Sequence, residues 1–188
     1  MLPDGFELLE AAAFTDVFGW NMVAGDRSTS LYTVGKKLTV PTSFGHIVQA
    51  KGTFATINSD DFCALALPGG FPRYGYFAVA DNADFLRIIH EFAAADKPIA
   101  AVCTASILLG KAGILKNRLA TSYQGEGGRW LEQLISLGAQ SSTDSICIDG
   151  RLITGSGPAS AIPVALQLLE MVTSPQIAAS VATMMGFK

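Results

Sequence analysis

The sequence predicts an α/β fold with a doubly wound, mostly parallel sheet and helices on both faces, as in a flavodoxin-like three-layer sandwich. Two short and wholly apolar runs, residues 65–67 and 99–102, have the composition of strands that are buried on both faces. A helical pattern at residues 83–95 lies between them, and a second one follows at 104–112. This strand–helix alternation is typical of a parallel sheet that is covered on each side.

The N-terminal part of the chain begins with a turn at residues 3–6 and continues with an amphipathic helix at 7–20. The apolar side chains of this helix recur at helical spacing, so they are available for the core. Four β-like runs come next in the sequence, at residues 31–34, 38–40, 47–48 and 63–67.

A β-hairpin is the clearest element of the C-terminal part. The Asp149-Gly150 dipeptide supplies the positive φ angles of a tight two-residue turn, so residues 145–148 should pair with 151–154. Ser174 followed by Pro175 marks the start of the last helix, which should run through residue 185. The other elements are a short strand and two helices, at residues 119–123, 128–137 and 161–171.

Length and composition favour a single globular domain over residues 1–188. The chain has 188 residues, of which 49% are hydrophobic and 15% charged, enough for one well-buried core. With 13 Lys and Arg against 16 Asp and Glu there is no basic stripe, so we expect no nucleic-acid partner. No run of about 18 apolar residues exists, and acidic residues occupy the N-terminal region, so we expect no membrane partner and a cytoplasmic location.

The cysteines and histidines suggest neither a disulfide framework nor a metal site. The chain has an odd number of cysteines, which are far apart in the sequence, and no C-x-x-C motif is present. They are Cys63, Cys103 and Cys147. The two histidines, His46 and His90, show no metal-ligand spacing. We therefore expect no metal and no cofactor.

Cys103 is the candidate nucleophile because it lies where the strand at 99–102 turns into the helix at 104–112. Such a turn lifts its corner residue into an exposed, strained position, and the small Ala101 and Ala105 allow it. The N–H groups of a helix N-terminus stabilise a thiolate, which predicts a pKa below the usual value of about 8.5. A buried core cysteine is the alternative. The loop Pro68-Gly69-Gly70 should share one crevice with Cys103, because ligands bind beyond the carboxyl ends of parallel strands.

An ordered set of motifs across nearly the whole chain resembles the ThiJ/PfpI superfamily, the relatives of class I glutamine amidotransferases that carry a cysteine nucleophile elbow. The motifs are Asp4-Gly5-Phe6-Glu7 with Glu10, Pro68-Gly69-Gly70, Ala101-Val102-Cys103-Thr104, Thr154-Gly155-Ser156-Gly157-Pro158-Ala159 and Met184-Met185-Gly186-Phe187.

The resemblance implies a role for each matched residue. Cys103 matches the elbow cysteine, and Glu10 the acidic residue that faces the sulfur as a protonated carboxyl. Without the resemblance, Glu10 would be interpreted as a solvated residue in the first turn of a helix. The main-chain N–H groups of Gly70 and Thr104 match an oxyanion pocket. Members of the superfamily are commonly homodimers. The residues expected to complete the pocket are Gly69, Tyr123, Gln124, Gly157 and Pro158.

The chain departs from its relatives at three places. Thr104 stands where many members have a His directly after the nucleophile, and Tyr123-Gln124 where others have one. The superfamily's first strand precedes the turn at residues 3–6, where this chain has only Met1-Leu2, so we expect the chain to begin inside that strand or to be trimmed. Hydrolysis of an amide needs an imidazole beside the sulfur to protonate the amine, and neither of the two positions where relatives have a histidine supplies one. We expect His90 to have a surface or packing role, and His46 is the histidine that could enter a pocket, its own or that of a dimer partner.

We therefore expect an enzyme that adds the Cys103 thiolate to a small electrophile, with Glu10 as the proton shuttle. Its chemistry would be that of a glyoxalase or deglycase, or of an isocyanide hydratase, within the hydrolases and lyases. A non-enzymatic redox or stress sensor that acts through Cys103 oxidation is the alternative. A third interpretation is a PfpI-like amidase or a degenerate ligand-binding member. Cys63 and Cys147 are expected inside apolar strands, which would leave Cys103 the most reactive thiol.

Overall fold

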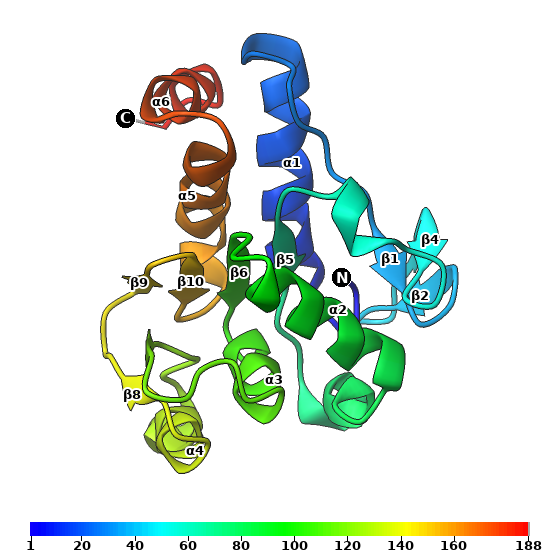
Figure 1. Cartoon of the computed structure of the whole chain (residues 1–188), viewed down its shortest axis with the longest axis vertical. Coiled ribbons are helices and arrows are strands. Elements are labelled where there is room, and N and C mark those ends of the chain that lie inside the picture. The colour runs from blue at the N-terminus through cyan, green and yellow to red at the C-terminus, as the bar shows by residue number, and fades with distance from the viewer. Residues whose placement is uncertain (188) are drawn as a thin grey trace.

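A computed structural model describes residues 1–187 of the chain. Its central sheet has four strands in the order β5, β6, β10, β9, of which the first three are parallel and β9 is antiparallel at the edge. Figure 1 shows β5, β6 and β10 in the middle of the molecule. The bounds of the four strands are Leu65–Leu67 (β5), Ile99–Val102 (β6), Leu152–Gly155 (β10) and Ile146–Asp149 (β9).

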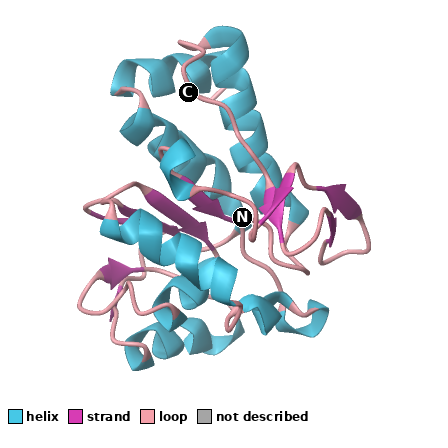
Figure 2. Ribbon diagram, turned by 45° about the vertical axis from the view of Figure 1, so that its right-hand side comes forward, coloured by secondary structure: helices cyan, strands magenta, loops and turns pink. Residues whose placement is uncertain are grey.

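Helices cover both faces of this sheet (Figures 1 and 2). The helices on one face are α1 (Leu8–Ala24), α5 (Ala161–Val172) and α6 (Pro175–Met184). The helices on the other face are α2 (Ala83–Ala94), α3 (Ala105–Lys111) and α4 (Arg129–Ser136).

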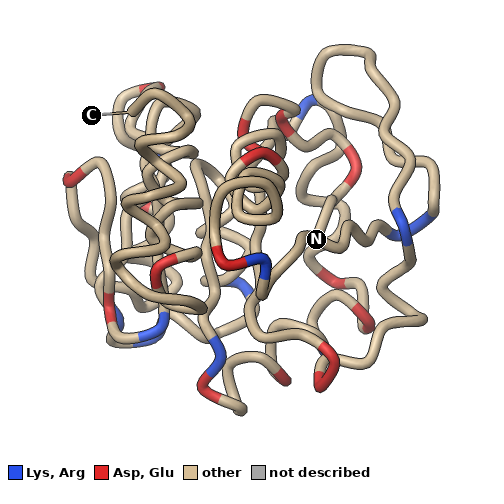
Figure 3. Tube along the Cα trace, turned by 90° about the horizontal axis from the view of Figure 1, so that it is seen from above, with Lys and Arg blue, Asp and Glu red and all other residues tan. Residues whose placement is uncertain are grey.

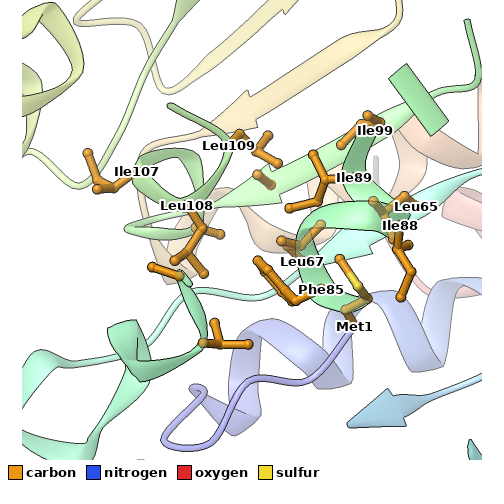
Figure 4. Packing of buried hydrophobic residues seen from close by; sticks show 14 of the residues in the cluster. Met1, Leu65, Leu67, Phe85, Ile88, Ile89, Ile99, Ile107, Leu108 and Leu109 are labelled. Carbon is orange, nitrogen blue, oxygen red and sulfur yellow. The ribbon is translucent and has the colours of Figure 1, made fainter. Parts of the chain in front are cut away.

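The side chains of β6 alternate between the two cores, as a fully buried strand requires. Ile99 and Ala101 belong to the cluster under α2 and α3, whereas Ala100 and Val102 belong to the cluster under α1 and α5. In Figure 4, Phe85 of α2 lies beside Leu67 of β5 and Met1, within the same cluster. The expected three-layer α/β sandwich is confirmed.

The remaining strands form three two-stranded sheets beside the central one. They are β1 (Val34–Gly35) with β4 (Gly52–Thr53), β2 (Thr39–Pro41) with β3 (Ile47–Gln49), and β7 (Leu119–Ala120) with β8 (Gln140–Ser141). Met1 and Leu2 lie between β5 and β1. The Met1 nitrogen donates to the Ala66 carbonyl at 2.6 Å, and the Leu2 N–H donates to the Val34 carbonyl at 2.7 Å.

Most expected elements are present, with shifted ends. The β9–β10 hairpin is confirmed, and Gly150 has the positive φ of +60° that its turn requires. Helix α1 continues past the expected end at residue 20 to Ala24, where the Gly25 N–H bonds to the Asn21 carbonyl. The expectation that Cys63 is buried in a strand is wrong. Pairing with β6 begins only at Leu65, so Cys63 lies before the strand and is exposed.

Charged residues of both signs are spread over the described part of the chain. Figure 3 shows Lys and Arg scattered among Asp and Glu rather than gathered in one stripe. Among residues 1–187, no helix combines the length and the apolar composition that crossing a bilayer requires.

Candidate active site

Cys103 occupies the sharp turn between β6 and α3 that the sequence predicts. Its φ of +59° lies in the left-handed region, which costs a non-glycine residue about 1–3 kcal/mol. Three hydrogen bonds hold it there. The Cys103 N–H donates to the Gly155 carbonyl at 2.7 Å, and the hydroxyls of Ser106 and Ser122 both donate to the Cys103 carbonyl at 3.1 Å. The neighbouring strand and two serines therefore stabilise the elbow.

Glu10 lies on the first turn of α1 and is fully buried beside Cys103, so the solvated alternative is wrong. One carboxyl oxygen, Oε2, accepts the Gly69 N–H at 2.6 Å. The other, Oε1, has no hydrogen-bond partner of ordinary geometry among residues 1–187. The turn before α1 determines where Glu10 lies. The Glu7 N–H donates to the Gly69 carbonyl at 2.7 Å, and this bond holds the start of α1 against the loop after β5.

Gly69 is the residue that allows Glu10 and Cys103 to approach each other. A Cβ at this position would lie 2.8 Å from the Cys103 Cβ and 2.9 Å from Glu10 Oε2. Distances this short are closer than van der Waals contact, so only glycine leaves room for both side chains. The Gly-Gly loop predicted to share a crevice with the elbow therefore lies directly against it.

The environment of Glu10 favours the neutral acid. Burial first, and then the charge of Glu7, raise its pKa from 4.5 to about 8, although the Gly69 N–H and Cys103 oppose this. At neutral pH the carboxyl is therefore protonated, as expected. Because Oε2 accepts a hydrogen bond, Oε1 is the oxygen that can carry the proton.

Cys103 behaves differently from the sequence expectation. Burial first, and then the Glu10 carboxyl, raise the pKa of its thiol, whereas the Thr104 N–H works in the opposite direction. The expected lowering is wrong because one N–H at the start of α3 does not offset burial and two nearby carboxyls. The resting side chain is a thiol, and it needs a base before it can react as a nucleophile.

The expected oxyanion pocket is differently arranged. The Thr104 N–H favours the thiolate form of Cys103, but the Gly70 N–H donates to Thr104 Oγ1 at 3.1 Å. That hydroxyl in turn donates to the Gly70 carbonyl at 2.7 Å. Thr104 thus ties the elbow to the Gly69-Gly70 loop, and Gly70 can donate to a substrate only if the Thr104 hydroxyl releases it.

A cavity of about 130 Å³ opens onto Cys103. Among the residues expected at the pocket, Gly70, Thr104, Tyr123 and Pro158 line it, together with Cys103.

Three expected pocket residues do not line the cavity. Gly69 lies against Glu10 and Cys103 instead. Gly157 is buried, where a Cβ would lie 3.4 Å from the Tyr123 ring. Gln124 is exposed, and its amide donates to the carbonyls of Thr143 and Asp144, so the expectation that it lines the pocket is wrong.

Sequence reasoning missed Glu126 and Trp130, which also line the cavity. Glycines flank Glu126 and are typical of a loop, but nothing local shows which way such a loop faces.

No histidine among residues 1–187 lines this cavity. His46 is exposed, and His90 lies exposed on α2 with its Nε2 2.8 Å from the Ala112 carbonyl oxygen. A larger cavity of about 340 Å³ lies between β1, β5 and α1, but neither Cys103 nor Glu10 lines it. In the described part of the chain, no three His, Cys, Asp or Glu side chains are grouped to hold a metal ion.

The raised pKa of Glu10 predicts a pH-dependent stability. Between pH 4.5 and about 8 the folded protein keeps a proton on Glu10 that the unfolded chain releases. The contribution of Glu10 to the unfolding free energy therefore falls as pH rises through this range, by at most about 1.4 kcal/mol per pH unit. Urea unfolding of wild type and Glu10→Gln across this range should show their difference declining with pH.

The comparison with Glu10→Gln is needed because a second titratable group changes the unfolding free energy in the opposite direction as pH rises. Burial lowers the pKa of the Met1 α-amino group to about 5, so its contribution to stability rises with pH in both proteins. Glu132→Gln, which removes an exposed carboxylate from α4, should follow wild type. A Glu10→Gln curve parallel to wild type would show that Glu10 is already ionised.

Comparison with known proteins finds a matching family model, curated relatives and solved structures of similar fold. A family model described as "DJ-1/PfpI family" matches residues 1–171. The isonitrile hydratase of Pseudomonas putida is 29% identical over 170 residues, which are 90% of this chain and 71% of that protein. Protein DJ-1 homolog D of Arabidopsis thaliana is 33% identical over 141 residues, which are 70% of this chain but only 34% of that protein.

Among solved structures, Drosophila melanogaster DJ-1beta superposes with a TM-score of 0.87 at 24% identity, over 100% of this chain and 95% of that one. This likeness shows the fold.

Proposed function

This chain belongs to the DJ-1/PfpI family, and we propose that it is a cysteine-dependent enzyme that adds the Cys103 sulfur to a small electrophile such as an α-oxoaldehyde or an isonitrile. The observation that carries the proposal is the buried Glu10 carboxyl, with a pKa of about 8, beside a cysteine that opens into a small cavity. Such a carboxyl exchanges protons readily near neutral pH, which a proton shuttle requires.

The first step with an aldehyde forms a bond between the sulfur and the carbonyl carbon, and the C=O π electrons move to oxygen. Glu10 gives its proton to that oxygen and receives the thiol proton, so the carboxyl ends as it began. From an α-oxoaldehyde, a proton then moves from the former aldehyde carbon to the neighbouring carbonyl carbon by way of an enediol, while the proton of the former aldehyde's hydroxyl passes to the other oxygen, which gives an α-hydroxy thioester. Water hydrolyses this thioester to a hydroxy acid and the free thiol.

With an isonitrile, the S–H group adds across the terminal carbon to give a thioimidate. Water converts the thioimidate to a formamide and releases the thiol. Neither reaction expels an amine, so a carboxyl is sufficient where no histidine is present. The relatives named isonitrile hydratase and deglycase support this class of chemistry. The absence of histidine from the cavity lining, within residues 1–187, weighs against the amidase interpretation.

The proposal predicts multiple turnovers by the reduced protein. Methylglyoxal should be converted to lactate, or an alkyl isonitrile to its formamide, and NMR spectroscopy of the mixture follows substrate and product together. Peroxide treatment that converts Cys103 to the sulfinic acid should stop the reaction, because that sulfur is no longer nucleophilic. Consumption of no more than one equivalent, across a wider panel of aldehydes and isonitriles, would contradict the proposal.

A redox sensor is the second candidate, and the unpaired Oε1 of Glu10 favours it. A protonated Oε1 can donate to an oxygen of oxidised Cys103, which would stabilise the sulfinic acid. A sensor would show an oxidation-dependent change in melting temperature or partner binding without turnover.

Homodimer formation, a cytoplasmic location and the small electrophile itself also remain proposals. The exposed apolar side chains of Phe44 and Ile47 support a homodimer, because burial against a second copy would remove them from water.

A further inference from the structure

The charged residues that line the Cys103 cavity are all acidic. Glu7 is nearly buried, with 8% of its surface exposed, and Glu126 lies at the loop before α4. Phe71, Pro72 and Trp130 supply apolar walls. Within the described residues, no lysine, arginine or histidine lines the cavity. A carboxylate or phosphate that entered would lose water without gaining a cationic partner.

Two arginines adjoin lining residues, and both are engaged. Arg73 stacks over the Phe71 and Tyr74 rings, and Arg129 precedes Trp130. The Arg129 guanidinium forms an ion pair with Glu126 at 2.5 Å and stacks over the Trp130 ring at 4.5 Å. The Trp130 indole N–H also donates to Glu126 Oε2, at 3.1 Å. These contacts hold the Glu126 carboxylate at the cavity wall. The backbone of Glu126 lies in the left-handed region, with a φ of +58°.

We propose that this cavity selects uncharged electrophiles over anionic ones, and that Glu126 determines the selectivity together with Glu7. The inference rests on the proposed function and narrows its substrate class. Aldehydes, dicarbonyls and isonitriles without a charged group would be accepted. Oxo acids and phosphorylated aldehydes would be rejected. The size of the cavity agrees with a small substrate, since about 130 Å³ is the volume of only roughly four molecules of liquid water.

Two alkylating agents of nearly equal shape test the selectivity without any turnover. Iodoacetamide is neutral and iodoacetate is an anion, and both react with the same thiolate. Their rate ratio therefore does not depend on the pKa of the cysteine. The exposed Cys63 gives the intrinsic ratio within the same molecule. Peptide mass spectrometry measures both sites in one sample.

At Cys103 the iodoacetamide-to-iodoacetate ratio should exceed that at Cys63 on the order of tenfold, because the buried Glu7 disfavours an anion. The half-exposed Glu126 cancels the charge of Arg129, so no free cation among residues 1–187 faces the cavity. Glu126→Gln should lower the Cys103 ratio threefold or more and leave the Cys63 ratio unchanged. Glutamine keeps an acceptor for the Trp130 N–H, so the loop is preserved. Glu132→Gln removes an equal charge from the exposed side of α4 and should change neither ratio.

Failure of this inference and failure of the proposed function give different results. Equal ratios at Cys103 and Cys63, or a Glu126→Gln variant with the wild-type ratio, would overturn the selectivity whether or not any substrate is consumed. A high ratio at Cys103 without turnover would leave the selectivity intact and contradict the enzyme. If both hold, Glu126→Gln should also raise kcat/KM for glyoxylate relative to methylglyoxal.

Discussion

Replacing Cys103 with serine is expected to lower kcat/KM for the preferred electrophile by at least about a thousandfold, as loss of a nucleophile does in other covalent enzymes. The cause is chemical, because a hydroxyl is far harder to ionise than a thiol and Glu10, with a pKa of about 8, is too weak a base to activate it. Substrate loss at fixed protein concentration measures the effect.

Cys63→Ser is the matched control for this variant. Cys63 lines the larger cavity, away from Glu10, and its loss should leave kcat/KM within about twofold of wild type. The exposure of Cys63 also changes what thiol labelling can show. Alkylation of Cys63 is expected to be rapid, so the most accessible thiol of this chain does not identify the nucleophile. A Cys103→Ser variant that keeps wild-type turnover would eliminate the elbow as the site of chemistry.

Replacing Gly69 with alanine is expected to lower both stability and activity. The new Cβ would lie 2.8 Å from the Val102 carbonyl oxygen at the end of β6 and 2.8 Å from the Cys103 Cβ, and the main chain of Cys103 is held by its hydrogen bond to Gly155. Overpacking of this kind costs roughly 1–3 kcal/mol, or several degrees in melting temperature. Turnover should fall by roughly a hundredfold, because separating Glu10 from the sulfur removes proton transfer.

Gly19→Ala provides the control for the glycine substitution. Gly19 lies on the exposed side of α1, where a Cβ would meet no atom of another element within 4 Å. Alanine should therefore stabilise the helix by about 0.5–1 kcal/mol and leave turnover unchanged. Thermal unfolding and substrate loss, measured on both variants, separate a general glycine effect from the contact at Gly69. A Gly69→Ala variant with wild-type turnover would show that close approach of Glu10 and Cys103 is unnecessary.

The sequence by itself determined the features that depend on neighbouring residues. The apolar run of β6 predicts a strand buried on both faces, and Asp149-Gly150 predicts the hairpin, because each pattern acts through local backbone preferences. The corner at Cys103 followed from a strand that passes directly into a helix. Glu10 was identified by resemblance, since nothing in the first turn of α1 distinguishes a buried carboxyl from a solvated one.

Only the tertiary structure decided the protonation states, the exposure of Cys63 and the walls of the cavity. Glu10 and Gly69 are 59 residues apart, and Thr104 and Gly70 are 34 apart, yet hydrogen bonds join each pair. Burial of Cys103 among these segments raises the pKa of its thiol, against the local effect of the helix start. Glu126 and Trp130 also line the cavity beside Cys103 only because the fold brings distant segments together. Burial and nearby charges act on a side chain through space, so its pKa and exposure depend on residues that are far away in the chain. No local pattern of the sequence contains that information.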